Sequence, residues 1–175
     1  LSGSPDAALI HHELGRLHWR QKQLVESRGH YRSALDIRRM RLGAHHPDTL
    51  KTSRHHAVVL MDMGLGEQAT RELEVTASAL EQAIDNAVDA SERKTLITNL
   101  ADARNTMAVL LIEDDRPAEG IAVMQQVIEL LREISEKPDQ DWRIGNTLNT
   151  LAEAKLSIGD MEGAESDLLR SMKIK

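Results

Sequence analysis

The chain has 175 residues and a formal net charge of −6, with 41% hydrophobic residues, 2% aromatic residues and no cysteine. The lack of cysteine excludes a disulfide framework, thiol catalysis and cysteine-ligated zinc, and it fits a reducing, cytoplasmic environment. A core without Phe must consist of Leu, Ile, Val, Ala and Met, which favours packed helices over a β-sandwich. No apolar run approaches the roughly 18 residues that a membrane-spanning helix needs.

Helical periodicity recurs along the chain, and turn-forming residues divide it into four helix pairs. The turn within a pair contains Gly64-Leu65-Gly66, Asp115-Arg116-Pro117 or Gly159-Asp160, and prolines at 47 and 138 separate successive pairs. The predicted first helices of the pairs cover residues 6–24, 48–63, 91–113 and 139–158. The predicted second helices cover residues 28–42, 66–88, 117–136 and 161–174.

The four pairs share one pattern of small and large residues. A bulky residue precedes a small one at Gly15, Ala57, Ala108 and Ala152. Twelve residues later comes a second small residue (Ser27, Ala69, Gly120, Ala164), and sixteen later a large one (Tyr31, Leu73, Met124, Leu168). Starts 42, 51 and 44 residues apart indicate a repeat array, in which small residues let helices approach and large ones fill the core. We expect one repeat domain over residues 1–175, with repeats at about 6–43, 47–88, 91–136 and 139–175, and we expect it to be a fragment of a larger protein.

These residues resemble the tetratricopeptide repeat. Leu14-Gly15, His18, Ser27, Tyr31 and Ala34 follow its pattern of bulky–Gly, aromatic, small, aromatic and Ala. The stretch from Leu42-Gly43 to His46-Pro47-Asp48-Thr49-Leu50 is similar to the long-linker variety, of about 42 residues, in kinesin light chains and bacterial multidomain regulators. The resemblance implies an all-α fold: an α-solenoid of eight antiparallel helices in a right-handed superhelix. The chain departs from the pattern at Asp115, Gly120 and Lys155.

The resemblance also implies that the first helices line a concave face that binds an extended peptide or a partner helix. The predicted ligand-binding residues are His12, Arg16, Trp19, Arg20, Lys51, Arg54, His55, Val58, Met61, Asn105, Val109, Ile112, Asn146, Asn149 and Glu153, with Asp102 and Leu156 beside them.

Two groups within this set suggest a mode of binding. Asn105 and Asn149 occupy equivalent repeat positions, and an Asn amide can pair with both groups of a peptide bond. Arg16, Arg20, Lys51 and Arg54 can fork onto a carboxylate, which predicts an acidic or carboxylate-terminated partner. The alternatives are that the asparagines are simply solvated and that the cations pair with local acids or point into solvent.

All eight histidines lie in residues 1–56, which hold 10 Lys or Arg against 5 Asp or Glu, whereas residues 57–175 hold 12 against 23. The pairs His11-His12, His45-His46 and His55-His56 invite a metal hypothesis, but adjacent helical residues point about 100° apart, so each pair offers one ligand. We predict no metal site and no cofactor, and we hypothesise a pH response instead. Trp19 is equally a groove anchor or a packing residue, packing is favoured for Trp142, and Met107 and Met124 are assigned to the core.

No phosphate-binding loop, nucleophile elbow or dinucleotide-binding motif occurs, so we predict no enzyme. The acidic balance of residues 57–175 argues against nucleic acid, and nothing indicates a membrane. The predicted function is recognition of a protein or peptide. The alternatives are a sensor or autoinhibitory segment of a bacterial regulator or signalling ATPase that contacts neighbouring domains of the same chain, an oligomerisation scaffold in which halves of opposite charge meet, and an accessory part of an enzyme.

Overall fold

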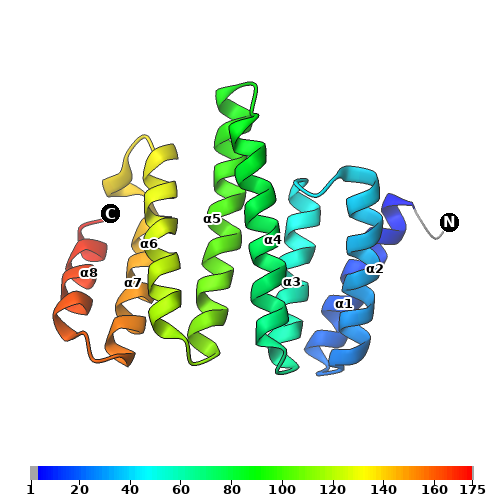
Figure 1. The fold of residues 1–175 in the computed structure, drawn as a ribbon, viewed down its shortest axis with the longest axis horizontal. Helices are drawn as coiled ribbons and strands as arrows, with labels where there is room; N and C mark the ends of the chain where they lie inside the picture. Colours follow the sequence, from blue (N-terminus) through cyan, green and yellow to red (C-terminus); the bar gives the residue numbers. More distant parts are fainter. Residues whose placement is uncertain (1–3, 175) are drawn as a thin grey trace. The chain divides into compact units, whose positions relative to one another are not determined.

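The computed structural model of the chain describes residues 4–174, which form eight α-helices and one short 3-10 helix and contain no strand (Figure 1). This confirms the all-α, helix-pair architecture. The helices are α1 (Pro5–Arg20), α2 (Leu24–Leu42), α3 (Pro47–Asp62), α4 (Gly66–Asp85), α5 (Ala90–Glu113), α6 (Pro117–Ile134), α7 (Trp142–Ser157) and α8 (Met161–Lys173), with η1 (Pro138–Gln140) before α7.

The chain divides into two compact units, Leu1–Asp85 and Asn86–Lys175. Unit 1 contains the pairs α1–α2 and α3–α4, and unit 2 contains α5–α6 and α7–α8. Each unit therefore holds two of the predicted repeats. A single domain, the repeat boundaries and the handedness of a superhelix stay predictions, and the boundaries at residues 1 and 175 lie outside the described residues.

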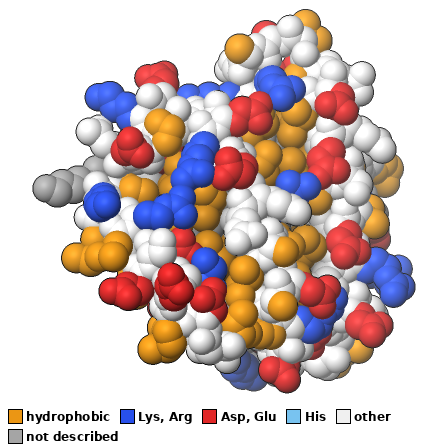
Figure 2. Space-filling model, turned by 60° about the vertical axis from the view of Figure 1, so that its left-hand side comes forward, with side chains coloured by type: hydrophobic (Ala, Val, Ile, Leu, Met, Phe, Trp, Pro, Cys, Tyr) orange, Lys and Arg blue, Asp and Glu red, His pale blue; other side chains and the backbone are white. Residues whose placement is uncertain are grey.

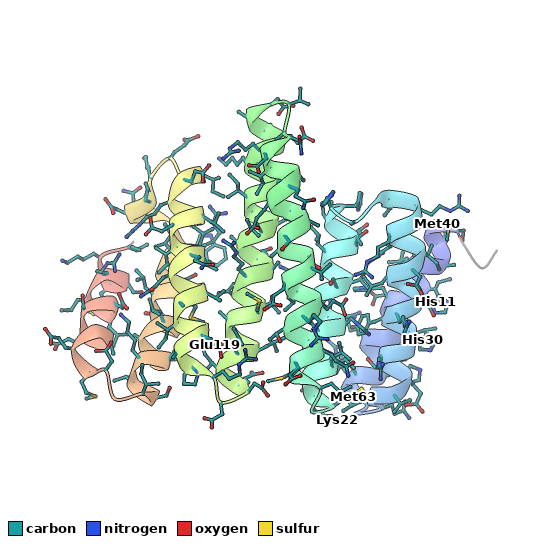
Figure 3. The ribbon with its side chains drawn as sticks, in the orientation of Figure 1. His11, Lys22, His30, Met40, Met63 and Glu119 are labelled. Atoms are coloured by element: carbon teal, nitrogen blue, oxygen red, sulfur yellow. The ribbon has the colours of Figure 1, made fainter. Side chains whose placement is uncertain are left out.

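The first turn was predicted too late in the chain. Helix α1 ends at Arg20 rather than near residue 24, and α2 begins at Leu24 rather than at 28. Lys22 makes the turn with φ of 60°, a conformation that usually falls to Gly, so no glycine marks the turn in the sequence. Figure 3 shows Lys22 at the end of the pair, where α1 meets α2. Asp115, one of the departures from the repeat pattern, adopts the same kind of conformation with φ of 58°.

The small residues lie where the two helices of a pair approach most closely. A Cβ atom at Gly15 would lie 2.9 Å from Cγ of Tyr31, and the Ser27 hydroxyl donates to the Gly15 carbonyl at 2.8 Å. A Cβ atom at Gly120 would lie 2.8 Å from the Ala108 carbonyl oxygen and 2.6 Å from Cγ1 of Ile112. The predicted role of these positions in helix packing is therefore confirmed.

Three of the four large residues of the pattern are buried, namely Tyr31, Leu73 and Met124. The fourth, Leu168, is 39% exposed, so its assignment to the core was wrong. Its neighbour Asp167 is buried instead, because its carboxylate accepts from Nζ of Lys155 at 2.7 Å and from Arg170 at 3.1 Å. Other apolar residues of α8 are exposed as well, and hydrophobic side chains are visible at the surface among charged ones (Figure 2).

Substitution of Gly15 by Ala tests the close crossing of α1 and α2. The added methyl group would meet the Tyr31 ring, so we expect unit 1 to lose about 1–3 kcal/mol of stability. Gly29→Ala in α2 is the matched control, because a Cβ atom at that position would meet open space and the helix gains about 0.5–1 kcal/mol. Urea unfolding followed by Trp19 fluorescence in a Trp142→Phe background measures both. Equal stability changes in the two variants would contradict the packing argument.

Candidate functional site

A hollow of about 420 Å³ opens between α5, α6 and α7 in unit 2. We call it the α5–α7 groove. Three helices supply its walls and floor: Thr98, Ala101, Asp102 and Asn105 from α5, Val127 and Leu131 from α6, and Trp142, Arg143, Asn146, Thr147 and Thr150 from α7. Its size falls within the range of about 300–1,000 Å³ typical of ligand sites.

The groove brings two of the predicted asparagines together. Asn105 lines it from α5 and Asn146 lines it from α7. Asn149, which shares the repeat position of Asn105, is exposed and lies outside the lining. Asn105 shares the groove with Asn146 rather than with Asn149. The repeat register specifies which face of a helix a residue lies on, but it does not specify how far adjacent helices are offset along their axes.

The floor of the groove is apolar and its rim carries an exposed aromatic ring. Val127 and Leu131 are buried beneath the hollow, whereas the Trp142 side chain is 70% exposed. The favoured assignment of Trp142 to packing was therefore wrong. Trp142 and Arg143 also line a second, more open hollow of about 700 Å³ that extends to Lys94 and Lys137.

Arg143 is held in place by the residue that caps the start of α7. The carboxylate of Asp141 caps the helix by accepting from the Arg143 backbone N–H at 3.0 Å, and it accepts from Nε at 2.9 Å and Nη2 at 2.6 Å. These bonds from Arg143 lower the pKa of Asp141 to about 2. The same bonds, with the charge of Asp102 adding to them, raise the pKa of Arg143. The guanidinium is thus committed to Asp141.

In unit 1, a polar network occupies the equivalent positions. His12 takes the repeat position of Asn105, and Arg38 takes that of Leu131. Arg38 donates through Nη1 to the Asp48 carbonyl at 2.8 Å and to the Thr52 hydroxyl, while Nδ1 of His12 lies 3.0 Å from the same hydroxyl. His12 is only 2% exposed. It therefore joins α1, α2 and α3 internally, and its burial argues against the predicted contact with a ligand.

Three of the four predicted cations of unit 1 act electrostatically on His55. Burial lowers the pKa of His55, and the charges of Arg54, Lys51 and Arg16 act on it in the same direction. The imidazole itself stacks on Tyr31 with ring centroids 5.8 Å apart. Arg16 also bonds to Glu13, at 2.9 Å from Nε and 2.6 Å from Nη2, as the alternative of local pairing foresaw.

The other predicted binding residues are placed individually. Trp19 is half-buried and donates its indole N–H to Asp62 at 2.7 Å, which ties α1 to α3. Ile112 packs beside Gly120 between α5 and α6 rather than along the groove, since a glycine leaves room for it there. Val58, Met61 and Val109 are half-buried, whereas Arg20 and Glu153 are exposed.

A second group of histidines lies on α1 and α2. Nδ1 of His11 is 3.0 Å from Nδ1 of His30, and the His18 ring stacks on His30 with centroids 5.2 Å apart. Figure 3 shows His11 and His30 side by side along this pair. Among residues 4–174, no three or more His, Asp or Glu side chains are grouped so as to hold a metal ion.

Sequence reasoning missed the floor and the aromatic rim of the groove. The signal was present in the repeat register, where Leu131 replaces Arg38 and Asn105 replaces His12. A repeat position that holds a charged residue in one unit and an apolar residue in the other indicates that the space beside it is used differently in the two units. Thr98, Thr147 and Thr150 carry no comparable signal.

The histidines predict that acid destabilises unit 1 selectively. Burial lowers the pKa of His12 to about 4 and also lowers those of His30 and His55, so the unfolded chain binds more protons below pH 6.5. Stability is fully present above about pH 6.5 and is lost as the pH falls toward 4; His12 alone contributes a loss of about 2 kcal/mol at pH 5. Urea unfolding at pH 7.5 and 5 with one tryptophan retained, Trp19 or Trp142, should show the loss in unit 1 only. An equal loss in both units would refute it.

The cap of α7 predicts a loss of stability in unit 2. Asp141→Ala removes the cap and the partner of Arg143, and we expect a cost of about 1–2 kcal/mol. Because the pKa of Asp141 is lowered to about 2, the difference between variant and parent should persist down to about pH 4 and disappear below it. The exposed Asp139→Ala is the control. Unfolding monitored by Trp142 measures the effect, and a variant as stable as the control would contradict the assigned role.

Residues 6–87 match the family model described as tetratricopeptide repeat. No curated protein matches the sequence. The crystal structure of BtubC (BKLC) from P. vanneervenii superposes with a TM-score of 0.74 at 16% identity, over 97% of this chain and 64% of that chain. The crystal structure of a Podosopora anserina kinesin-light-chain candidate with nearly identical TPR-like repeats superposes with a TM-score of 0.40 at 16% identity, over 97% of this chain and 95% of that chain.

The chain thus spans 64% of the length of the BtubC structure, whose likeness shows the fold alone. Tetratricopeptide repeats generally mediate protein–protein interactions and are generally non-catalytic. None of the described helices is at once long and apolar enough to cross a bilayer. The long-linker variety stays a prediction. Residues 6–87 are therefore similar to tetratricopeptide repeats, and the chain has the helical fold of a repeat solenoid.

Proposed function

We propose that this chain is a protein-recognition module and that its α5–α7 groove binds an extended peptide segment. The observation that carries the proposal is the convergence of Asn105 and Asn146 on one hollow with an apolar floor. Sites for peptides commonly combine a few polar groups with apolar pockets. The match of residues 6–87 to an interaction repeat supports the same function class.

The two asparagines suit a peptide backbone. Each amide offers a donor and an acceptor, so it can pair with the N–H and C=O of a peptide unit without reading the side chain. Leu131 and Val127 then receive an apolar side chain of the ligand. The asparagines would contact the ligand backbone and so select little for its sequence. The apolar floor would contact a ligand side chain and so select more strongly.

The two adjoining hollows set the length of the segment. Lys94 and Asn105 mark their ends on α5 and are eleven residues apart, or about 16 Å along the helix. An extended chain advances about 3.3 Å per residue, so about five ligand residues would fit.

A second candidate site lies on unit 1 and would take a carboxylate. Arg16, Lys51 and Arg54 all act electrostatically on His55, which favours their placement around one surface. A terminal carboxylate or an acidic side chain is the complementary group. The bonds of Arg16 to Glu13 weaken this candidate, because a ligand would have to compete with them.

The wider role of the module depends on the protein that contains it. Autoinhibition of a regulator, contact with neighbouring domains of the same chain, self-association as a scaffold and a cytoplasmic location are proposals that fit an interaction repeat. The groove mechanism applies to each of them, because an intramolecular segment and a separate partner present the same backbone.

Selection of random 12-residue peptides displayed on phage tests the groove. We expect recovered peptides to lose about tenfold or more in affinity for the Asn105→Ala/Asn146→Ala protein, since two backbone clamps are removed. Fluorescence anisotropy of labelled synthetic peptides measures the loss.

Asn149→Ala is the matched control, because this asparagine lies on the same helix but outside the groove lining. Helix content and unfolding midpoints should agree among all three proteins. Recovered peptides that bind the double variant as tightly as the parent would refute the groove as the site.

A further inference from the structure

The α5–α7 groove contains a cation that is already bonded to a carboxylate. Arg143 is the one cation of the lining, and both its Nε and its Nη2 donate to Asp141. The charge of Asp102, which also lines the groove, acts on the same guanidinium. Two carboxylates, Asp102 and Asp141, thus act on one guanidinium. An acidic ligand would have to pull Arg143 away from Asp141, whereas a basic ligand would not.

Trp142 adds a surface that favours cations. It stands at the mouth of the groove, 70% exposed, and it is the one aromatic residue of unit 2. The face of an indole attracts guanidinium and ammonium groups within about 6 Å of its centre.

The field of unit 2 acts in the same direction. Residues 86–175 carry 11 Lys or Arg against 17 Asp or Glu, whereas residues 1–85 carry 11 of each. Lys94 and Lys137 line the adjoining hollow, which also contains Trp142, together with Glu136 and Asp141. A cationic side chain is therefore favoured near Asp102, and a neutral or acidic one near the two lysines.

We infer that the segment bound in the α5–α7 groove carries an arginine or lysine whose charged head lies on the face of Trp142, next to Asp102. The inference rests on the proposed function, since it specifies the ligand of the same groove. It also orders the ligand along the two hollows, with the basic residue near Asn105 and Asn146 and neutral or acidic residues near Lys94 and Lys137.

Titrations of the nitrogen-15-labelled protein with three small probes test the inference. The probes are the N-acetyl methylamides of arginine, glutamate and alanine, which share a peptide backbone and differ in charge. We expect the arginine compound to shift the indole N–H resonance of Trp142 and to bind about three- to tenfold more tightly than the glutamate compound. The preference should decline as salt is added.

Two substitutions locate the effect. Asp102→Asn should remove most of the preference for arginine, and Trp142→Leu should weaken the arginine compound while leaving the alanine compound unchanged. Glu153→Gln, an exposed carboxylate of α7 outside the groove lining, is the matched control and should leave the preference intact.

The outcomes separate this inference from the proposed function. If the alanine compound and the phage-selected peptides bind through Asn105 and Asn146 but the glutamate compound binds as well as the arginine one, the inference is refuted and the groove function stands. If no probe moves the Trp142, Asn105 or Asn146 resonances and no selected peptide depends on the asparagines, both are refuted.

Discussion

The helix pairs of this chain exist because a side chain is small or absent where their two helices cross. Gly15 accepts the face of the Tyr31 ring, and Gly120 leaves room for Ile112 and the Ala108 carbonyl. A chain with 2% aromatic residues has few large side chains with which to bridge a wide gap between helices. Burial must then come from aliphatic groups at short range, so the spacing of the helices is set before any surface residue matters.

This shared spacing leaves other positions free to differ between the units. In unit 1, Arg38, His12 and Thr52 form a buried network that ties three helices together. In unit 2, Leu131, Asn105 and Thr147 stand at the same repeat positions and enclose a hollow. One helix-pair architecture thus contains a polar network in one unit and an open groove in the other, and the side chains at these three repeat positions are part of the difference.

Most of the fold could be predicted from the sequence because prolines and glycines mark the ends of its helices. Pro47 and Pro117 begin α3 and α6, and Gly64 and Gly159 adopt positive φ after α3 and α7. The first turn escaped prediction because Lys22, an ordinary residue, takes a conformation that costs it energy. Leu168 escaped because burial at its position requires a neighbouring element, which a repeat pattern assumes but does not supply.

The candidate site was predicted only in part. The register identified Asn105 and Asn146 as facing residues but favoured Asn149 as the partner of Asn105, because position within a repeat fixes direction and not the offset between adjacent helices. His12 and Ile112 share the direction of the groove residues yet are taken up by internal packing. Trp142 begins its helix, where repeat patterns carry least information.

The contrast between Arg38 and Leu131 has a consequence for how such arrays diversify. The polar network and the groove differ at one position on the second helix of a pair (Arg38 or Leu131) and one on the first (His12 or Asn105). Neither position takes part in the close crossing of the two helices. Substitutions at these two positions can therefore alter recognition in one helix pair without disturbing the close crossing of its helices. A chain of this kind is modular in specificity even where it is uniform in shape.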